Sequence, residues 1–132
     1  MRVMVDTNIL LSAFVFGSAK MASLLEKVIE EHTMVLSTYI IDEFRSVVAE
    51  KSPAYNHNID TLFAKLSYEM AYTPTWQEFM PDIRDEKDKP ILAAAILSDV
   101  DVIITGDKDF YGVDIERPEI LSPAGFWEMY GG

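Results

Sequence analysis

Short apolar runs alternate along the first half of the chain with stretches in which apolar residues recur every three or four positions. Val3 to Val5 is the first run, and Lys20 to Glu31 has the spacing of an amphipathic helix. Thr33 to Ser37 is a second apolar run, followed by helical spacing from Tyr39 to about Lys51, where Pro53 ends the pattern. This half therefore predicts the order strand, helix, strand, helix.

The second half continues the alternation. Residues 54–72 show helical spacing, and a short strand is expected near Tyr72 to Trp76. Lys89 to Leu97 is apolar on nearly every side, which predicts a buried helix. Val100 to Thr105 is a β-branched run typical of a parallel strand that is covered on both faces.

The chain ends with a short strand around Glu119 to Leu121 and a helix that starts at Ser122 and Pro123. No linker, repeat or low-complexity segment interrupts the sequence. The alternating order predicts a three-layer α/β fold with a mainly parallel central sheet, in a single domain over residues 1–132.

Composition narrows the function classes. With 132 residues and 49% hydrophobic content, the chain has the size of one domain and can bury a core. There is no apolar run of membrane-spanning length and no secretory signal, so we expect a cytoplasmic protein. Cysteine is absent, and the two histidines have no zinc-like spacing, so oxygen atoms must hold any metal ion.

Charge sets a further condition. Twenty-two acidic residues against eleven basic ones give a formal net charge of -11, which opposes nonspecific binding to phosphates. A nucleic-acid substrate could bind only where metal ions and local basic residues offset this field. The basic residues expected near enough to help are Lys20, Arg45, Lys87, Lys89 and Lys108.

Two acids directly follow predicted strands. Asp6 comes after the first strand, and Asp107 follows Thr105 and Gly106 at the end of a later one. Because parallel strands end at the same sheet edge, where ligands collect, both acids are candidate site residues. The alternative is that Asp6 or Asn8 only caps a following helix.

Two further acids lie on predicted helices. Asp88 is expected to cap the apolar helix that begins at Lys89. Glu43 shares a helical stripe with Ile40 and Val47, so we expect it to point partly inward. An inward acid is costly unless it is paired or metal-bound, whereas an acid at the edge of the stripe would reach solvent.

If these four carboxylates converge, they repel one another and must recruit cations or change their protonation. Mg²⁺ and Mn²⁺ suit hard oxygen ligands and can activate water for attack on a phosphodiester. Hydrolysis of a nucleic-acid backbone is the chemistry that this arrangement favours.

Four segments, in this order, resemble the PIN-domain family: VDTNILLS (5–12), STYIIDE (37–43), DEKDKPIL (85–92) and ITGDKDF (104–110). The tail ILSPAGF (120–126) resembles the ending of its prokaryotic toxin-like members. The resemblance covers essentially the whole chain. It implies a Mg²⁺- or Mn²⁺-dependent ribonuclease, the VapC-like toxin of a toxin–antitoxin pair, with an antitoxin partner and a homodimeric state.

The resemblance also assigns site residues. Those that match the family's metal-binding and catalytic acids are Asp6, Glu43, Asp88 and Asp107. Thr7, Asn8 and Thr105 match supporting polar positions that would orient the carboxylates. Asp109 would either add an acid to the metal site or order the loop before Phe110, and the structural role is favoured.

Other classes of protein stay open. A magnesium-dependent phosphohydrolase of the aspartyl-phosphate type would need an acid two residues after Asp6, where this chain has Asn8. A PIN-fold binding module without nuclease activity would be expected to lack one of the four acids, and all are present. A dinucleotide-binding fold is disfavoured because no G-x-G-x-x-G follows a predicted strand.

Overall fold

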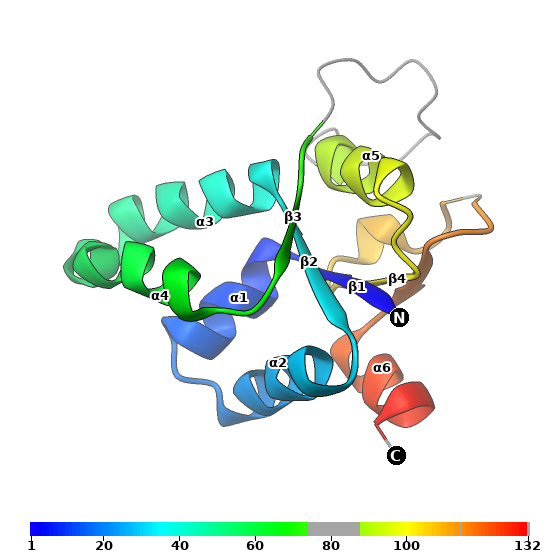
Figure 1. Ribbon diagram of the computed structural model, residues 1–132, viewed down its shortest axis with the longest axis horizontal. Helices are drawn as coiled ribbons and strands as arrows, with labels where there is room; N and C mark the ends of the chain where they lie inside the picture. Colours follow the sequence, from blue (N-terminus) through cyan, green and yellow to red (C-terminus); the bar gives the residue numbers. More distant parts are fainter. Residues whose placement is uncertain (74–87, 114, 132) are drawn as a thin grey trace.

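Five parallel strands form the central sheet of the computed structural model, which describes residues 1–73, 88–113 and 115–131 (Figure 1). The strands are β1 (Arg2–Val5), β2 (Thr33–Ser37), β3 (Glu69–Ala71), β4 (Val102–Ile104) and β5 (Glu119–Leu121). Their order across the sheet is β3-β2-β1-β4-β5, and every neighbouring pair is parallel. The predicted mainly parallel sheet is confirmed.

The strand order places a topological switch point beside β1. From β1 the chain moves outward through β2 to β3, and later returns to the other side of β1 to add β4 and β5. In open parallel sheets, ligands bind beyond the carboxyl ends of the two strands at such a point. Here those strands are β1 and β4, which end just before Asp6 and Thr105.

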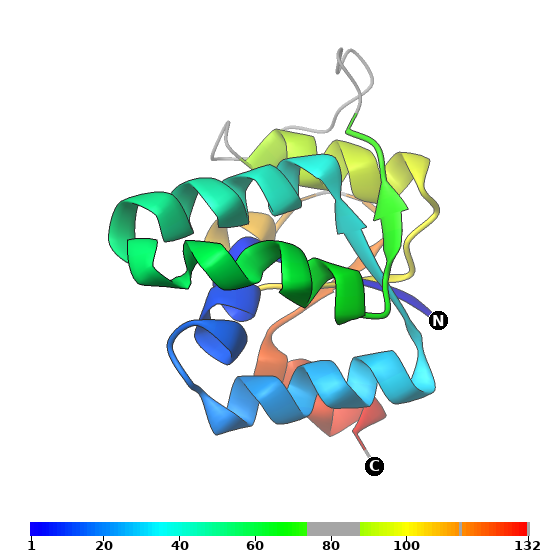
Figure 2. The same ribbon diagram turned by 60° about the vertical axis from the view of Figure 1, so that its left-hand side comes forward.

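Helices cover both faces of the sheet, so the three-layer prediction is also confirmed. The helices are α1 (Thr7–Phe14), α2 (Ala19–Glu31), α3 (Thr38–Lys51), α4 (Ile59–Lys65), α5 (Lys89–Leu97) and α6 (Pro123–Tyr130), with 3₁₀ turns η1 (Pro53–Asn58) and η3 (Lys108–Phe110). The α3 and α5 helices lie on one face, and α2 and α6 on the other (Figures 1 and 2). No single helix in the described ranges is long and apolar enough to cross a membrane; α1 and α2 meet the criterion only together, as a pair bent by 115°.

The core follows the apolar pattern of the sequence. Val3, Met4 and Val5 of β1 are fully buried because the central strand has helices over both faces. In α5, the buried run Ile91 to Ala95 explains why this helix is apolar on nearly every side. Its bounds and those of β5 agree with the sequence prediction.

The predicted helix over residues 54–72 is wrong. This stretch contains η1, then α4, then the edge strand β3. Leu66 leaves the helical conformation with a ψ of 130°, and Ala71 pairs with Ser37 of β2. The strand expected near Tyr72 to Trp76 therefore comes earlier, at Glu69–Ala71, and residues 74–76 lie outside the described part of the chain.

Candidate active site

Asp6 connects the central strand to the first helix. It is buried, with 5% of its surface exposed, and it is the N-cap of α1. Its Oδ1 accepts a hydrogen bond from the Ile9 amide at 3.1 Å, and its Oδ2 accepts one from the Thr105 hydroxyl at 2.5 Å. Asp6 therefore both caps a helix and lies at the strand end, so the two sequence interpretations hold together.

Thr105 joins Asp6 to the acid that follows β4. Its Oγ1 donates to Asp6 and accepts a hydrogen bond from the Asp107 amide at 3.0 Å. Asp107 in turn is the N-cap of η3, because its Oδ1 accepts a hydrogen bond from the Asp109 amide at 2.9 Å. This chain of hydrogen bonds fixes both strand-end acids relative to each other.

Glu43 reaches the same place from α3. Its side chain is half-buried, and its Oε1 accepts a short hydrogen bond from the hydroxyl of Thr7, the residue after Asp6. Thr7 is itself buried, so its hydroxyl has a fixed position. The expected partly inward orientation of Glu43 agrees with this contact.

These side chains line one cleft of about 190 Å³. The lining residues are Asp6, Thr7, Asn8, Glu43, Val47, Asp88, Ile91 and Asp107. All four acids singled out from the sequence thus meet, although they come from two strand ends and two helices. Ile91 was not predicted to line the site; its position three residues after Asp88, one helical turn away, was the available signal.

Asp88 occupies the first position before α5, as predicted, but does not act as a cap. Its backbone is already helical, with φ −86° and ψ −14°, and its side chain makes no capping hydrogen bond to the α5 amides. The side chain is 7% exposed and lines the cleft instead. The carboxylate is therefore directed to the other acids rather than to the helix end.

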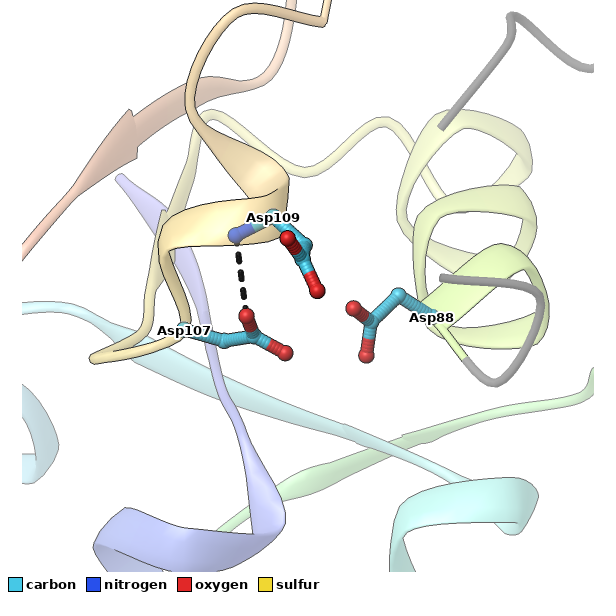
Figure 3. A group of neighbouring side chains, drawn as sticks. All are labelled: Asp88, Asp107 and Asp109. Atoms are coloured by element: carbon cyan, nitrogen blue, oxygen red, sulfur yellow. Dashed lines mark hydrogen bonds between the residues drawn. The ribbon is translucent and has the colours of Figure 1, made fainter. Parts of the chain in front are cut away.

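Asp109 joins this group. One carboxylate oxygen from each of Asp88, Asp107 and Asp109 lies within 4.8 Å of the other two (Figure 3). Two oxygens bound to the same Mg²⁺ ion at about 2.1 Å are at most about 4.2 Å apart, so the three carboxylates need little rearrangement to share a cation. The backbone of Asp109 orders the turn, and its carboxylate faces Asp88 and Asp107. This placement favours Asp109 as a further acid of the metal site, whereas the sequence interpretation favoured a structural role.

Burial raises the pKa of the Asp6 carboxyl above its ordinary value. The hydrogen bonds from Thr105 and Ile9 act in the opposite direction and lower this pKa. The negative charges of Asp107 and Glu43 raise it further. Keeping a buried carboxylate charged among other carboxylates costs free energy, and a bound cation would offset that cost.

A family model for the PIN domain matches residues 2–109. The chain belongs to the PIN-domain family. Among curated proteins, no significant match to its sequence is found.

Two solved structures have folds similar to that of this PIN domain. One is a chain of the VapBC2 structure from Rickettsia felis, in which VapBC2 is bound to a DNA fragment from its promoter. It has a TM-score of 0.71 and 19% sequence identity, and the match covers 92% of this chain and 98% of that chain. The other is Mycobacterium tuberculosis VapC20, a sarcin-ricin loop cleaving toxin, with a TM-score of 0.60, 10% identity, and coverage of 82% and 92%. At these identities the likeness establishes the fold.

The supporting polar residues of the PIN domain divide into two kinds. Thr7 and Thr105 each hold an acid by a hydrogen bond. Asn8 is exposed at the cleft, and within the described ranges it makes no hydrogen bond to an acid. Asn8 therefore lines the cleft without holding an acid.

The basic residues also divide. Arg45 of α3 forms an ion pair with Asp60 and lies over the Phe63 ring, so its positive charge interacts with side chains of α4. Lys108 is exposed within η3, between Asp107 and Asp109, and Lys89 is half-buried at the start of α5. Lys20 is exposed at the start of α2, and Lys87 lies outside the described residues.

Proposed function

We propose that this PIN domain is a Mg²⁺- or Mn²⁺-dependent endoribonuclease and the toxin of a toxin–antitoxin pair. The observation that carries the proposal is the cleft in which acids from two strand ends and two helices meet. The acids proposed to bind the metal and support catalysis are Asp6, Glu43, Asp88 and Asp107. The charges of such a cluster repel one another, and a divalent cation is the simplest compensation for them.

The donor set fits these ions. Every candidate ligand is a carboxylate oxygen, and hard oxygen ligands suit Mg²⁺ and Mn²⁺. Asp109 is proposed as a further ligand because its carboxylate belongs to the group within 4.8 Å that also contains Asp88 and Asp107. When bound, the ion would lower the pKa of a water molecule and compensate charge on a phosphodiester.

The remaining polar residues position this group. The Thr105 hydroxyl and the Ile9 amide hold Asp6, and the Thr7 hydroxyl holds Glu43. A carboxylate that is already oriented loses little entropy when it binds a cation or accepts a proton from the attacking water. Asn8 and Lys108 are proposed to contact the RNA backbone, since both are exposed beside the acids.

The partners are proposed by analogy. VapC20 cleaves the sarcin-ricin loop, and VapBC2 is bound to a fragment of promoter DNA. These neighbours support an RNA substrate and an antitoxin protein for this PIN domain. We also propose a homodimer, as the family resemblance implies, and a location in the cytoplasm, as the sequence composition predicts.

The proposal is tested by incubating a panel of structured and single-stranded RNAs with the protein in Mn²⁺, Mg²⁺ or EDTA. Asp6→Asn and Asp88→Asn preserve the shape of each side chain and remove its charge. Asp42→Asn is the matched control, because Asp42 precedes Glu43 on α3 but is exposed. We expect cleavage by the wild type and the control in the presence of metal, and none by either cleft variant.

Two results would contradict the proposal. Cleavage that continues in EDTA would remove the metal from the reaction, and equal cleavage by the wild type and both cleft variants would remove the acids from it. A folded protein that cuts no RNA in the panel would favour a binding module with the PIN fold.

A further inference from the structure

A second and larger cavity adjoins η3 at Phe110, the last residue of that turn. Its volume is about 540 Å³, within the range of small-molecule sites, and among the described residues it shares no lining residue with the acid cleft. Its lining includes Phe110 and Tyr111, which directly follow Asp109, and Pro118, Glu119 and Ile120 at β5. We call it the Tyr111 cavity.

Tyr111 connects this cavity to the acid cleft. Its phenol hydroxyl donates a hydrogen bond of 3.0 Å to the Thr105 carbonyl, and the Thr105 hydroxyl holds Asp6. The Tyr111 side of the cavity is therefore anchored at the end of β4, next to the acids. Tyr111 is still 42% exposed, so part of its ring is open to a ligand.

The chemistry of the lining selects a neutral, flat ligand with hydrogen-bond donors. Aromatic and aliphatic side chains supply apolar contact, and the charged lining residues among those described are Glu116 and Glu119, which repel phosphate. Glu119 is half-buried, and its Oε1 accepts a hydrogen bond of 2.9 Å from the Tyr130 hydroxyl. This hydrogen bond holds the Glu119 carboxylate in place.

We infer that the Tyr111 cavity binds a nucleobase that carries an exocyclic amino group, next to the phosphate handled by the acid cleft. Unstacked RNA bases stack on aromatic side chains and are read by hydrogen bonds at their edges. A carboxylate accepts from the N4 amino group of cytosine, whereas uracil presents an oxygen at the same place. The inference rests on the proposed function, because it assigns the cavity to the RNA substrate.

The short length of η3 allows one RNA strand to reach both the acid cleft and the Tyr111 cavity. Three residues of 3₁₀ helix rise about 6 Å, so one RNA strand can place a phosphate at Asp107 and Asp109 and a nearby base against Tyr111. The acidic residues of the cavity repel the phosphates, and the exposed part of the Tyr111 ring accepts the base. Cleavage would then depend on the base near the cut.

The test is a titration of the ¹⁵N-labelled full chain with cytidine and, separately, uridine in EDTA, with amide chemical shifts as the readout. The absence of metal and of a phosphodiester makes the result independent of nuclease activity. We expect saturable shifts at Tyr111, Gly112 and Ile120 with cytidine, and about tenfold weaker binding of uridine, the size of effect of one base-edge contact.

Variants separate the two parts of the inference. Tyr111→Ala is expected to abolish the cytidine shifts, and Tyr111→Phe to keep them, since the ring remains. Tyr72→Ala, at a tyrosine that is 79% exposed after β3, is the control and should change nothing. Glu119→Gln keeps the oxygen that Tyr130 contacts and adds an amide donor, so it should reverse the preference toward uridine.

The inference is overturned if cytidine at millimolar concentration causes no saturable shifts at the cavity. It is also overturned if cytidine and uridine bind equally and Glu119→Gln leaves that ratio unchanged. A protein that shows no RNA cleavage but binds cytidine as expected would contradict the proposed function and leave the base site standing.

Discussion

Asp107→Asn is expected to stabilise the protein when no metal is present. Asp107 supplies one of the three carboxylate oxygens that lie within 4.8 Å of one another, so its charge is repelled by both Asp88 and Asp109. Asparagine keeps an Oδ1 that can accept the 2.9 Å hydrogen bond from the Asp109 amide. The substitution therefore removes charge with little change in shape.

Coulomb's law sets the magnitude. Two unit charges 4.8 Å apart repel by about 3.5 kcal/mol at an effective dielectric of 20 and by about 0.9 kcal/mol in water. Asp107 and Asp109 are half-buried, so the lower part of this range applies to each pair. Replacing a charged acceptor by a neutral one costs about 1 kcal/mol. We expect a net gain of about 1–3 kcal/mol, or about 4–11 °C in Tm for 132 residues.

Thermal unfolding of the wild type and Asp107→Asn in EDTA and in Mn²⁺ measures this effect. In EDTA the variant should unfold at the higher temperature. At about 100 times Kd, Mn²⁺ should stabilise the wild type by about 2.7 kcal/mol and the variant by less. If Asp107→Asn folds but is less stable than the wild type in EDTA, the acids are not in repulsion and the electrostatic reasoning is refuted.

Three further predictions concern pH and hydrogen bonding. The fold raises the pKa of Asp6, so the folded state still holds the Asp6 proton above pH 3.8, where the unfolded state loses it. The stability of the metal-free protein should therefore fall as pH rises through the folded-state pKa. Urea unfolding should show a smaller fall for Asp6→Asn. Burial lowers the His32 pKa below 6.5, so stability should decrease as pH falls through 6.5 toward the lower folded-state pKa, and His32→Phe should remove this dependence. Thr105→Val leaves the Asp6 carboxylate and the Asp107 amide without their bridge and should cost about 1–3 kcal/mol in urea unfolding, whereas Thr105→Ser should retain most of the stability.

Elements whose pattern is complete within a short window could be predicted from the sequence. The α5 helix is apolar on nearly every side because it is buried, and this local signal fixed its bounds. The β3 strand has no such signal, because its three residues are strand only through pairing with β2. Leu62, Leu66 and Met70 continue the helical spacing, which is why the sequence pattern predicts a helix that extends past the observed end of α4 at Lys65.

The sequence predicts the placement of those site residues that the sheet topology brings together, but not of those whose orientation depends on a turn. Asp6 and Asp107 follow neighbouring parallel strands, so the sheet itself brings them together. The orientation of Asp109 depends on the 3₁₀ turn after Asp107, and the sequence pattern contains no sign of that turn's direction. The exposure of Asn8 follows in the same way from its place on the first turn of α1.

The most direct test of the claim that the acid cleft is a divalent-metal site is calorimetric titration of Mn²⁺ into the wild type, Asp88→Asn and Asp107→Asn, with Asp42→Asn as control. The wild type and the control should show the same saturable binding, and each cleft variant should bind at least about tenfold more weakly. If the folded wild type binds no Mn²⁺, or if all four proteins bind it equally, the acid cleft is not the metal site.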